Sequence, residues 1–190
     1  MDYYQVLAKF EQDEASFTVQ SPWDSALYYS DVDSRLFQQA PYVLVDHCYE
    51  QYGMSDWLKI GVGLLASKKV QQIFFEQGFS GIQFVPLAVD NKGLNRDFAF
   101  AHTTAYYDLL DPDASEATRF NKKRGLYRNV FEERIDKAKF ERTPIRHDCF
   151  TLTNYRASYY VSTQVKQALE AAGITGVKFI PMKFASIESV

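Results

Sequence analysis

The chain has 190 residues, of which 46% are apolar and 16% aromatic, with a formal net charge of −3. That length predicts one domain, and the composition is sufficient for a packed core. No apolar run approaches the roughly 20 residues that a membrane-spanning helix needs. The N-terminus has no basic segment followed by an apolar stretch, and two cysteines make no disulfide framework. We therefore expect a cytoplasmic protein that has no membrane partner.

Short runs rich in Val, Ile, Tyr and Phe predict strands along the whole chain. They occupy residues 3–10, 26–29, 42–45, 98–103, 129–135 and 149–153. Helices are expected at 67–77 and 162–172, and a weaker one at 48–58 is broken near Gly53. The polar segment 108–125 contains Pro112 and Gly125 and predicts a long loop. Because strands outnumber helices and do not alternate with them, the predicted class is α+β with a mixed or antiparallel sheet.

Residues 64–87 are repeated without a gap at residues 159–182, an offset of 95 residues. The first copy reads LLASKKVQQIFFEQGFSGIQFVPL and the second reads YYVSTQVKQALEAAGITGVKFIPM. Seven positions are identical, and these are residue types that shape backbone or core. The period is far too long for a solenoid repeat. We interpret the repeat as a duplicated unit inside a single domain spanning 1–190.

Each copy has the pattern of a helix, a tight turn and a strand. Ser67 and Ser162 stand where a helix N-cap belongs, since a serine oxygen can accept from a first-turn N–H. Gly78 and Gly173 stand where a left-handed residue ends a helix. The runs that follow Gly81 and Gly176 predict strands. Phe84 and Phe179, on those strands, are predicted to be buried core residues.

Charge is distributed unevenly along the chain. Residues 1–60 hold ten acidic and three basic side chains, whereas residues 61–190 hold 14 and 18. The basic excess is concentrated at 119–146. Opposite charges on two parts of one chain can orient a protein partner during encounter. The acidic third is the predicted partner surface, through residues in or beside predicted loops and strand ends: Asp31, Asp33, Asp46, Glu50 and Asp56.

No motif in the chain makes a case for an enzyme, a cofactor or a metal. The nine glycines form no nucleotide-binding fingerprint. Two clusters, Asp46-His47-Cys48 and His147-Asp148-Cys149, carry zinc-type ligands, but adjacent ligands point to opposite faces of a strand. His147 and Cys149 would share a face, yet no orienting residue or oxyanion donor can be named for them. His102 is expected to be a packed strand residue.

The two repeat segments resemble the class-eleven immunity domain of bacterial polymorphic toxin systems, long catalogued as a domain of unknown function. The resemblance rests on the N-cap serine, the paired glycines and the Phe-x-Pro strand. It runs from Ala66 to Pro86 in mid-chain, and at the C-terminus it covers 150–152 and 160–181. An acidic pair, Asp108 and Asp111, also resembles the family, which often has an acidic turn at this place. The resemblance implies a small cytoplasmic protein that binds a cognate toxin domain, and no catalytic residues carry over.

The expected function is therefore stoichiometric neutralisation of a toxin domain, without turnover. The alternative is a nucleic-acid-binding or regulatory module that uses the basic segment 119–146, where aromatic residues are interleaved with the cations. The sequence pI of about 5.6 argues against that alternative. The sequence is also compatible with a homo-oligomer, and it does not specify the toxin or its activity.

Overall fold

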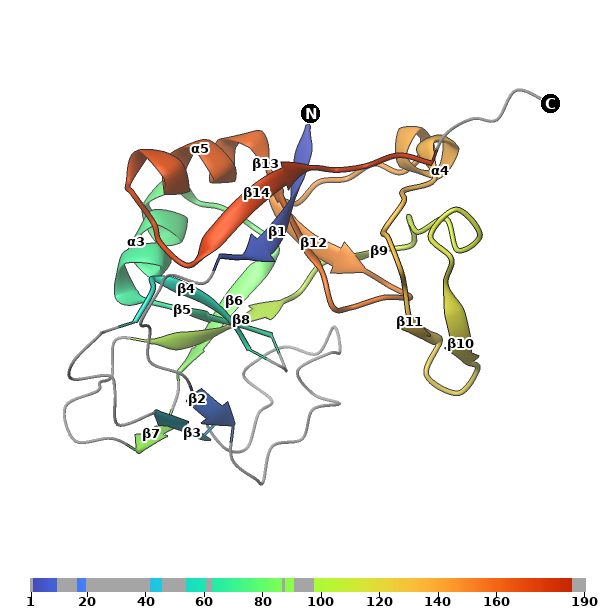
Figure 1. The fold of residues 1–190 in the computed structure, drawn as a ribbon. Coiled ribbons are helices and arrows are strands. Elements are labelled where there is room, and N and C mark those ends of the chain that lie inside the picture. Colours follow the sequence, from blue (N-terminus) through green and yellow to red (C-terminus); the bar gives the residue numbers. More distant parts are fainter. Residues whose placement is uncertain are drawn as a thin grey trace.

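The computed structural model describes residues 2–9, 17–19, 42–45, 54–60, 63–86, 88–90 and 98–185. It has the predicted α+β class, with helices packed against a group of mixed and antiparallel sheets (Figure 1). No helix in these ranges is long and apolar enough to cross a membrane. The predicted strand at 26–29 and most of the predicted helix at 48–58 lie outside the described residues.

The described helices are short, and most described strands have three to six residues. The helices are α3 (Lys68–Gln77), α4 (Lys137–Arg142) and α5 (Thr163–Ala171). The strands of the first half are β1 (Tyr3–Ala8), β2 (Phe17–Val19), β3 (Tyr42–Val45), β4 (Trp57–Ile60), β5 (Gly63–Ala66), β6 (Ile82–Pro86) and β7 (Ala88–Asp90). The later strands are β8 (Ala99–Thr103), β9 (Tyr106–Tyr107), β10 (Thr118–Asn121), β11 (Leu126–Asn129), β12 (Cys149–Leu152), β13 (Tyr159–Ser162) and β14 (Val177–Pro181).

Two sheets carry the main core, and two smaller sheets lie beside them. The larger main sheet has the order β14-β1-β13-β12-β9, and the other has the order β4-β5-β8-β6. Strands β2, β3 and β7 form a third sheet, and β10 pairs with β11 alone. The pairs β9–β12 and β3–β7 are parallel, so the fold is mixed.

Both repeat segments have the predicted helix, turn and strand, in the same order. The Ser67 and Ser162 hydroxyls accept from the backbone N–H of Val70 (3.4 Å) and Val165 (3.3 Å), as a serine N-cap should. Gly78 and Gly173 have left-handed backbones, with φ of 66° and 64°. The order of elements is thus confirmed, whereas superposition of the two segments stays a prediction.

A second glycine in each turn is required for steric reasons. Gly81 and Gly176 have φ of 94° and 88°. A Cβ on Gly81 would lie 1.8 Å from the Cys149 carbonyl oxygen, and one on Gly176 would lie 2.3 Å from the Trp57 carbonyl oxygen. Each turn therefore passes directly against a strand backbone of the other main sheet, and only glycine fits there.

The two main sheets exchange a strand. The N-terminal strand β1 inserts between β13 and β14, so it completes the sheet built by the second repeat segment. Strand β8 inserts between β5 and β6 and completes the sheet of the first segment. In Figure 1, β1 (blue) accordingly runs beside β13 and β14 (orange and red). Each half of the chain thus lends one strand to the sheet of the other half.

The pairings in the two sheets correspond at the same offset of 95 residues. Val6 pairs with Phe179 on one side and Tyr159 on the other. Ala101 lies 95 residues after Val6 and pairs with Phe84 and Leu64. Phe84 and Leu64 in turn lie 95 residues before Phe179 and Tyr159, the two partners of Val6. The correspondence therefore extends beyond the segments in which the sequence repeat is visible.

Side chains of the main sheets form two apolar clusters. The first lies under α3 and α5 and includes Trp57, Phe74, Val161 and Leu169. The second lies on the other face of the β1–β13–β12 sheet, where the segment that carries β9, α4 and the β10–β11 hairpin packs; its members include Tyr3, Leu110, Phe150 and Tyr160. Tyr160 and Val161, adjacent in β13, belong to different clusters, as strand alternation requires.

The structure corrects several predictions made from local pattern. Residues 129–135 are not a strand, because β11 ends at Asn129 and only an isolated bridge at Ile135 follows. The predicted loop at 108–125 contains β10, and the helix α4 was missed. The end of the predicted helix at 48–58 is strand β4, which pairs with β5. Phe84 and Phe179 are half-buried at the rim of the first cluster, so their prediction as fully buried core was wrong.

Candidate binding surface

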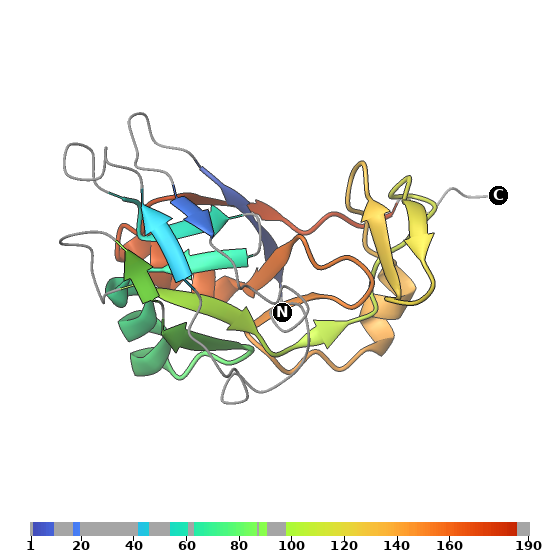
Figure 2. The ribbon, with the colours of Figure 1, turned by 90° about the horizontal axis from the view of Figure 1, so that it is seen from below.

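A two-stranded hairpin, formed by β10, its turn and β11, lies at the end of the molecule opposite α3 and α5 (Figures 1 and 2). We call residues 118–129 the basic hairpin. Its register pairs Thr118 with Asn129 and Phe120 with Tyr127. The Tyr127 N–H donates to the Asn154 carbonyl oxygen at 2.9 Å, which ties the second strand to the body of the protein. The hairpin is thus a structured projection.

The turn of the basic hairpin follows from two residue types. The Asn121 side-chain oxygen accepts from the N–H groups of Lys123 (3.0 Å) and Arg124 (3.1 Å), an Asx turn. Gly125 has φ of 65°, which a glycine adopts without strain. An asparagine and a glycine four residues apart between two short β-prone runs were the signal that sequence reasoning missed.

The basic hairpin carries a concentrated positive charge. It contains Arg119, Lys122, Lys123, Arg124 and Arg128 and no acidic residue, so its formal charge is +5. All five residues are exposed. Among the described residues, no ion pair involves any of these five cations. Within the described part of the chain, no ion pair therefore neutralises their charge.

The acidic side chains that follow the basic hairpin are engaged elsewhere. Glu132 is 2.6 Å from both Arg134 and Lys183, and the hydrogen bond from Lys183 lowers the pKa of Glu132. Glu133 accepts from Gln5, Ser158 and Tyr160. Glu116, just before β10, is exposed and is the nearest acidic residue in sequence on that side. Most of the positive charge of the basic hairpin therefore remains uncompensated within the described part of the chain.

Exposed aromatic rings accompany the charge. Phe120 is 48% exposed, and its ring centroid lies 4.7 Å from that of Tyr127 across the hairpin. Phe131, two residues beyond β11, is 84% exposed although its N–H donates to the Ser115 carbonyl oxygen at 3.2 Å. Ser115 is fully buried and also binds the backbone of Arg134 through its hydroxyl. Phe131 is thus an exposed ring on a backbone that is held in place.

A polar cluster around Glu133 is a second candidate. One carboxylate oxygen accepts from Gln5 (2.7 Å) and from the Ser158 hydroxyl, and the other accepts from the Tyr160 hydroxyl at 2.8 Å. Burial, and then the Glu133 charge, raise the pKa of Tyr160 well above its ordinary value. These donors come from β1, β13 and the residue just before it. The cluster therefore attaches the segment after β11 to the sheet, a structural role.

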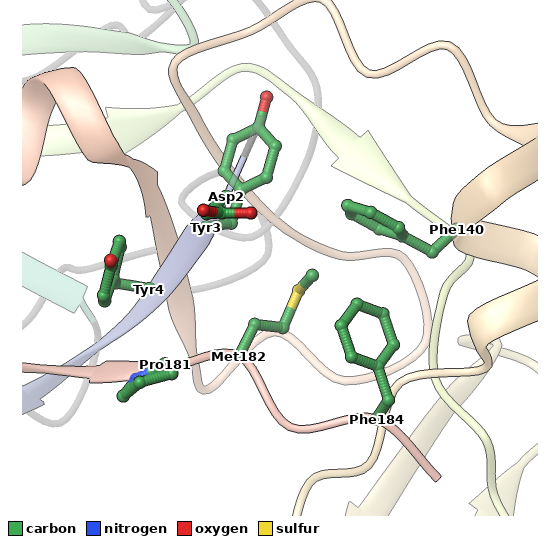
Figure 3. Close-up of a pocket in the computed structure, with 7 residues that line it drawn as sticks. All are labelled: Asp2, Tyr3, Tyr4, Phe140, Pro181, Met182 and Phe184. Atoms are coloured by element: carbon green, nitrogen blue, oxygen red, sulfur yellow. The ribbon is translucent and has the colours of Figure 1, made fainter.

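An apolar pocket is the third candidate (Figure 3). Its volume is about 200 Å³, and it lies where β1 and the end of β14 meet α4. It is lined by Asp2, Tyr3, Tyr4, Phe140, Pro181, Met182 and Phe184. The Tyr3 hydroxyl donates to the His147 carbonyl oxygen (3.0 Å), and burial raises the pKa of Tyr3 to about 12. The walls are therefore mainly aromatic and apolar side chains, and Asp2 is the exposed carboxylate among them.

His147 and Cys149 do not form a nucleophile–base pair. Cys149 is buried in the cluster under α3 and α5, and burial raises the pKa of its thiol well above the ordinary value. His147 Nδ1 instead lies 2.7 Å from the Tyr107 hydroxyl, so His147 and Cys149 have different neighbours. His102 is fully buried in β8, as predicted for a packed strand residue. A neutral buried thiol is a poor nucleophile and a poor metal ligand.

No group of three or more His, Cys, Asp and Glu side chains that could hold a metal ion occurs in the described ranges. The other candidate cluster, Asp46-His47-Cys48, lies outside those ranges.

Of the predicted acidic partner residues, the structure describes only Asp56. Asp31, Asp33, Asp46 and Glu50 lie outside the described residues. Both Asp56 carboxylate oxygens are used within the molecule: one accepts from the Ser67 hydroxyl at 2.9 Å, and the other from the N–H and hydroxyl of Thr175, each at 3.2 Å. Asp56 joins the start of α3 to the turn before β14. A partner role for any of the five stays a prediction.

No family model matches the chain, and no curated protein matches it.

Proposed function

We propose that this protein binds a toxin domain one to one and neutralises it, as a cytoplasmic immunity protein of a bacterial polymorphic toxin system. The proposal combines the sequence resemblance of the repeat segments with the character of the exposed surface. Stoichiometric inhibition needs a stable scaffold and a surface patch that complements its target, and it needs no reactive group.

The observation that carries the proposal is the exposure of Phe131 and Phe120 beside the cations of the basic hairpin. Aromatic residues and arginine are enriched among the residues that dominate protein–protein binding energy. Single exposed apolar residues are common on protein surfaces. Here two such rings and five cations, three of them arginines, occupy 14 consecutive residues, 118–131, which supports a role in binding a protein partner.

The proposal expects the adjacent open reading frame to encode the toxin domain, and co-expression with that domain tests it. The protein should restore growth of cells that produce the toxin domain, and the purified pair should elute as a 1:1 complex in size-exclusion chromatography with light scattering. The proposal would be wrong if growth inhibition persists when both proteins are expressed equally and no complex forms.

The second candidate function is nucleic-acid binding, and the same +5 hairpin favours it. A polyanion is attracted by clustered lysine and arginine, and binding then weakens steeply as salt rises. Titration of a fluorescent 20-nucleotide oligothymidylate at 50 and 200 mM NaCl tests this function directly. Micromolar affinity that falls at least tenfold between the two salt concentrations would favour it over immunity.

A further inference from the structure

The basic hairpin has a charge that the described structure does not balance. Five cations occupy twelve residues, and none of them forms an ion pair within the described chain. The adjacent acids Glu132 and Glu133 are held by other partners. We propose that the basic hairpin is the surface on which this protein holds an acidic face of its partner protein, an inference that rests on the proposed binding function.

The hairpin brings cations from both strands near one another. Arg119 lies between the paired residues Thr118 and Phe120, and Arg128 lies between their partners Tyr127 and Asn129. Like charges held near one another repel, and carboxylates of a partner bound at this position would relieve that repulsion.

Three observations favour an acidic protein over a nucleic acid. Each strand has four residues, so the charged face is only about 13 Å long and spans few phosphates. The rings of Phe120 and Tyr127 pack against each other at 4.7 Å, and they are not set apart as platforms for successive bases. Phe131 supplies an exposed apolar side chain that a pocket on a protein partner can accept.

The test compares two triple variants of the full chain that have the same net charge. In the hairpin variant, Lys123, Arg124 and Arg128 are each replaced by Glu. The control variant carries Lys68→Glu, Lys69→Glu and Lys178→Glu, three exposed lysines on α3 and β14. Each substitution changes the charge by two, so both variants carry −9 in place of −3. Circular dichroism and thermal melting verify that both are folded.

Association with the toxin domain from the adjacent open reading frame is then measured by stopped-flow between 50 and 500 mM NaCl. The hairpin variant should associate on the order of tenfold or more slowly at 50 mM salt, and the difference should shrink as salt screens the charges. The association rate of the control variant should stay within about twofold of the wild-type rate once salt screens the change in net charge.

The outcomes separate the inference from the proposed function. If wild-type protein neutralises the toxin domain and the two triple variants associate equally fast, the hairpin inference is wrong and the immunity function stands. If wild-type protein does not bind the toxin domain at micromolar concentration, both the proposed function and the hairpin inference are wrong. If wild-type protein instead binds the oligothymidylate and only the hairpin variant loses that binding, the basic hairpin is a nucleic-acid site and the acidic-protein inference is overturned.

Discussion

The Asp148 carboxylate accepts hydrogen bonds from both the N–H (2.9 Å) and the hydroxyl (2.8 Å) of Ser80, a residue 68 positions earlier in the chain. Asp56 makes the equivalent pair of contacts with Thr175, which stands 95 residues after Ser80. Each aspartate thus joins the sheet of one half to the turn that follows the helix of the other. These contacts hold the two halves together through polar groups.

Replacing Asp148 with Ala should lower the free energy of unfolding by about 1–3 kcal/mol, because the N–H of Ser80 loses its partner in a partly buried site. Urea denaturation measures the change. Asp113→Ala is the matched control, since Asp113 is exposed and should change stability by less than about 0.5 kcal/mol. Equal effects of the two substitutions would show that the Ser80 contact contributes nothing.

Gly81→Ala should be far more destabilising than Gly125→Ala. Both glycines have positive φ, so both substitutions strain the backbone by about 1–2 kcal/mol. Only at Gly81 would the new Cβ also clash, 1.8 Å from the Cys149 carbonyl oxygen, which adds roughly 1–3 kcal/mol. Thermal melts of the two variants compare these costs. Similar melting temperatures would mean that the two halves can separate at this contact without loss.

Phe84→Ala should cost about 1–3 kcal/mol, which is less than the 3–5 typical of a fully buried phenylalanine. The Phe84 ring is only half-buried, although it packs edge-on against Phe74 at 5.5 Å. Phe75→Ala provides the comparison because Phe75 is 88% exposed on the same helix as Phe74. Chemical denaturation that ranks Phe75 above Phe84 would contradict the assignment of the core.

Stability should be constant near neutral pH and should fall as the pH rises above about 9, since burial also raises the pKa of the Cys149 thiol. Tyr160 and Tyr3 have raised pKa values in the folded protein, Tyr3 to about 12, so in that range the unfolded chain loses phenolic protons that the folded chain keeps. The unfolded state then binds fewer protons, and rising pH favours it. Unfolding followed at pH 8 and pH 11 tests this sign. Tyr160→Phe, which removes one of the groups with a raised pKa, should show a smaller difference between the two pH values.

Phe131→Ser should raise the rate at which the toxin domain dissociates, with little effect of salt, because the ring contributes apolar contact and no charge. Phe75→Ser is the control, since that ring is equally exposed but lies on α3, away from the basic hairpin. Surface plasmon resonance gives both dissociation rates. If the control is the only variant that dissociates faster, the binding surface lies on the helical side of the molecule.

Sequence reasoning succeeded where the signal was local. Ser67 and Gly78 delimit α3, and each acts through residues within one turn, so their types predict the helix limits closely. The exchange of β1 and β8 could not be predicted, because the pairing of Val6 with Phe179 is a contact between opposite ends of the chain. No residue of Tyr3–Ala8 is identical to its counterpart 95 positions later, so no visible repeat suggested the exchange.

The strands of the basic hairpin were also not predicted from the sequence. Its composition is polar, so hydrophobic periodicity had nothing to detect, and the strands were assigned to a loop. The Asx turn at Asn121 was readable in principle. The internal use of Asp56 was not, because its partner Thr175 is 119 residues away and only the folded chain brings them together. Sequence charge therefore identified an acidic region but not which of its carboxylates face outward.

The placement of β1 has a consequence for the order in which the protein takes shape. Tyr3–Ala8 is synthesised well before both of its neighbours in the sheet, β13 (Tyr159–Ser162) and β14 (Val177–Pro181). The sheet that contains β8 can close once residue 103 has emerged, whereas β1 has no pairing partner until residues 159–181 are available. Chains cut short before β13 would keep both edges of β1 unpaired, and unpaired edges invite pairing with other chains. The sheet that contains β1 therefore closes only after the second repeat segment has been synthesised.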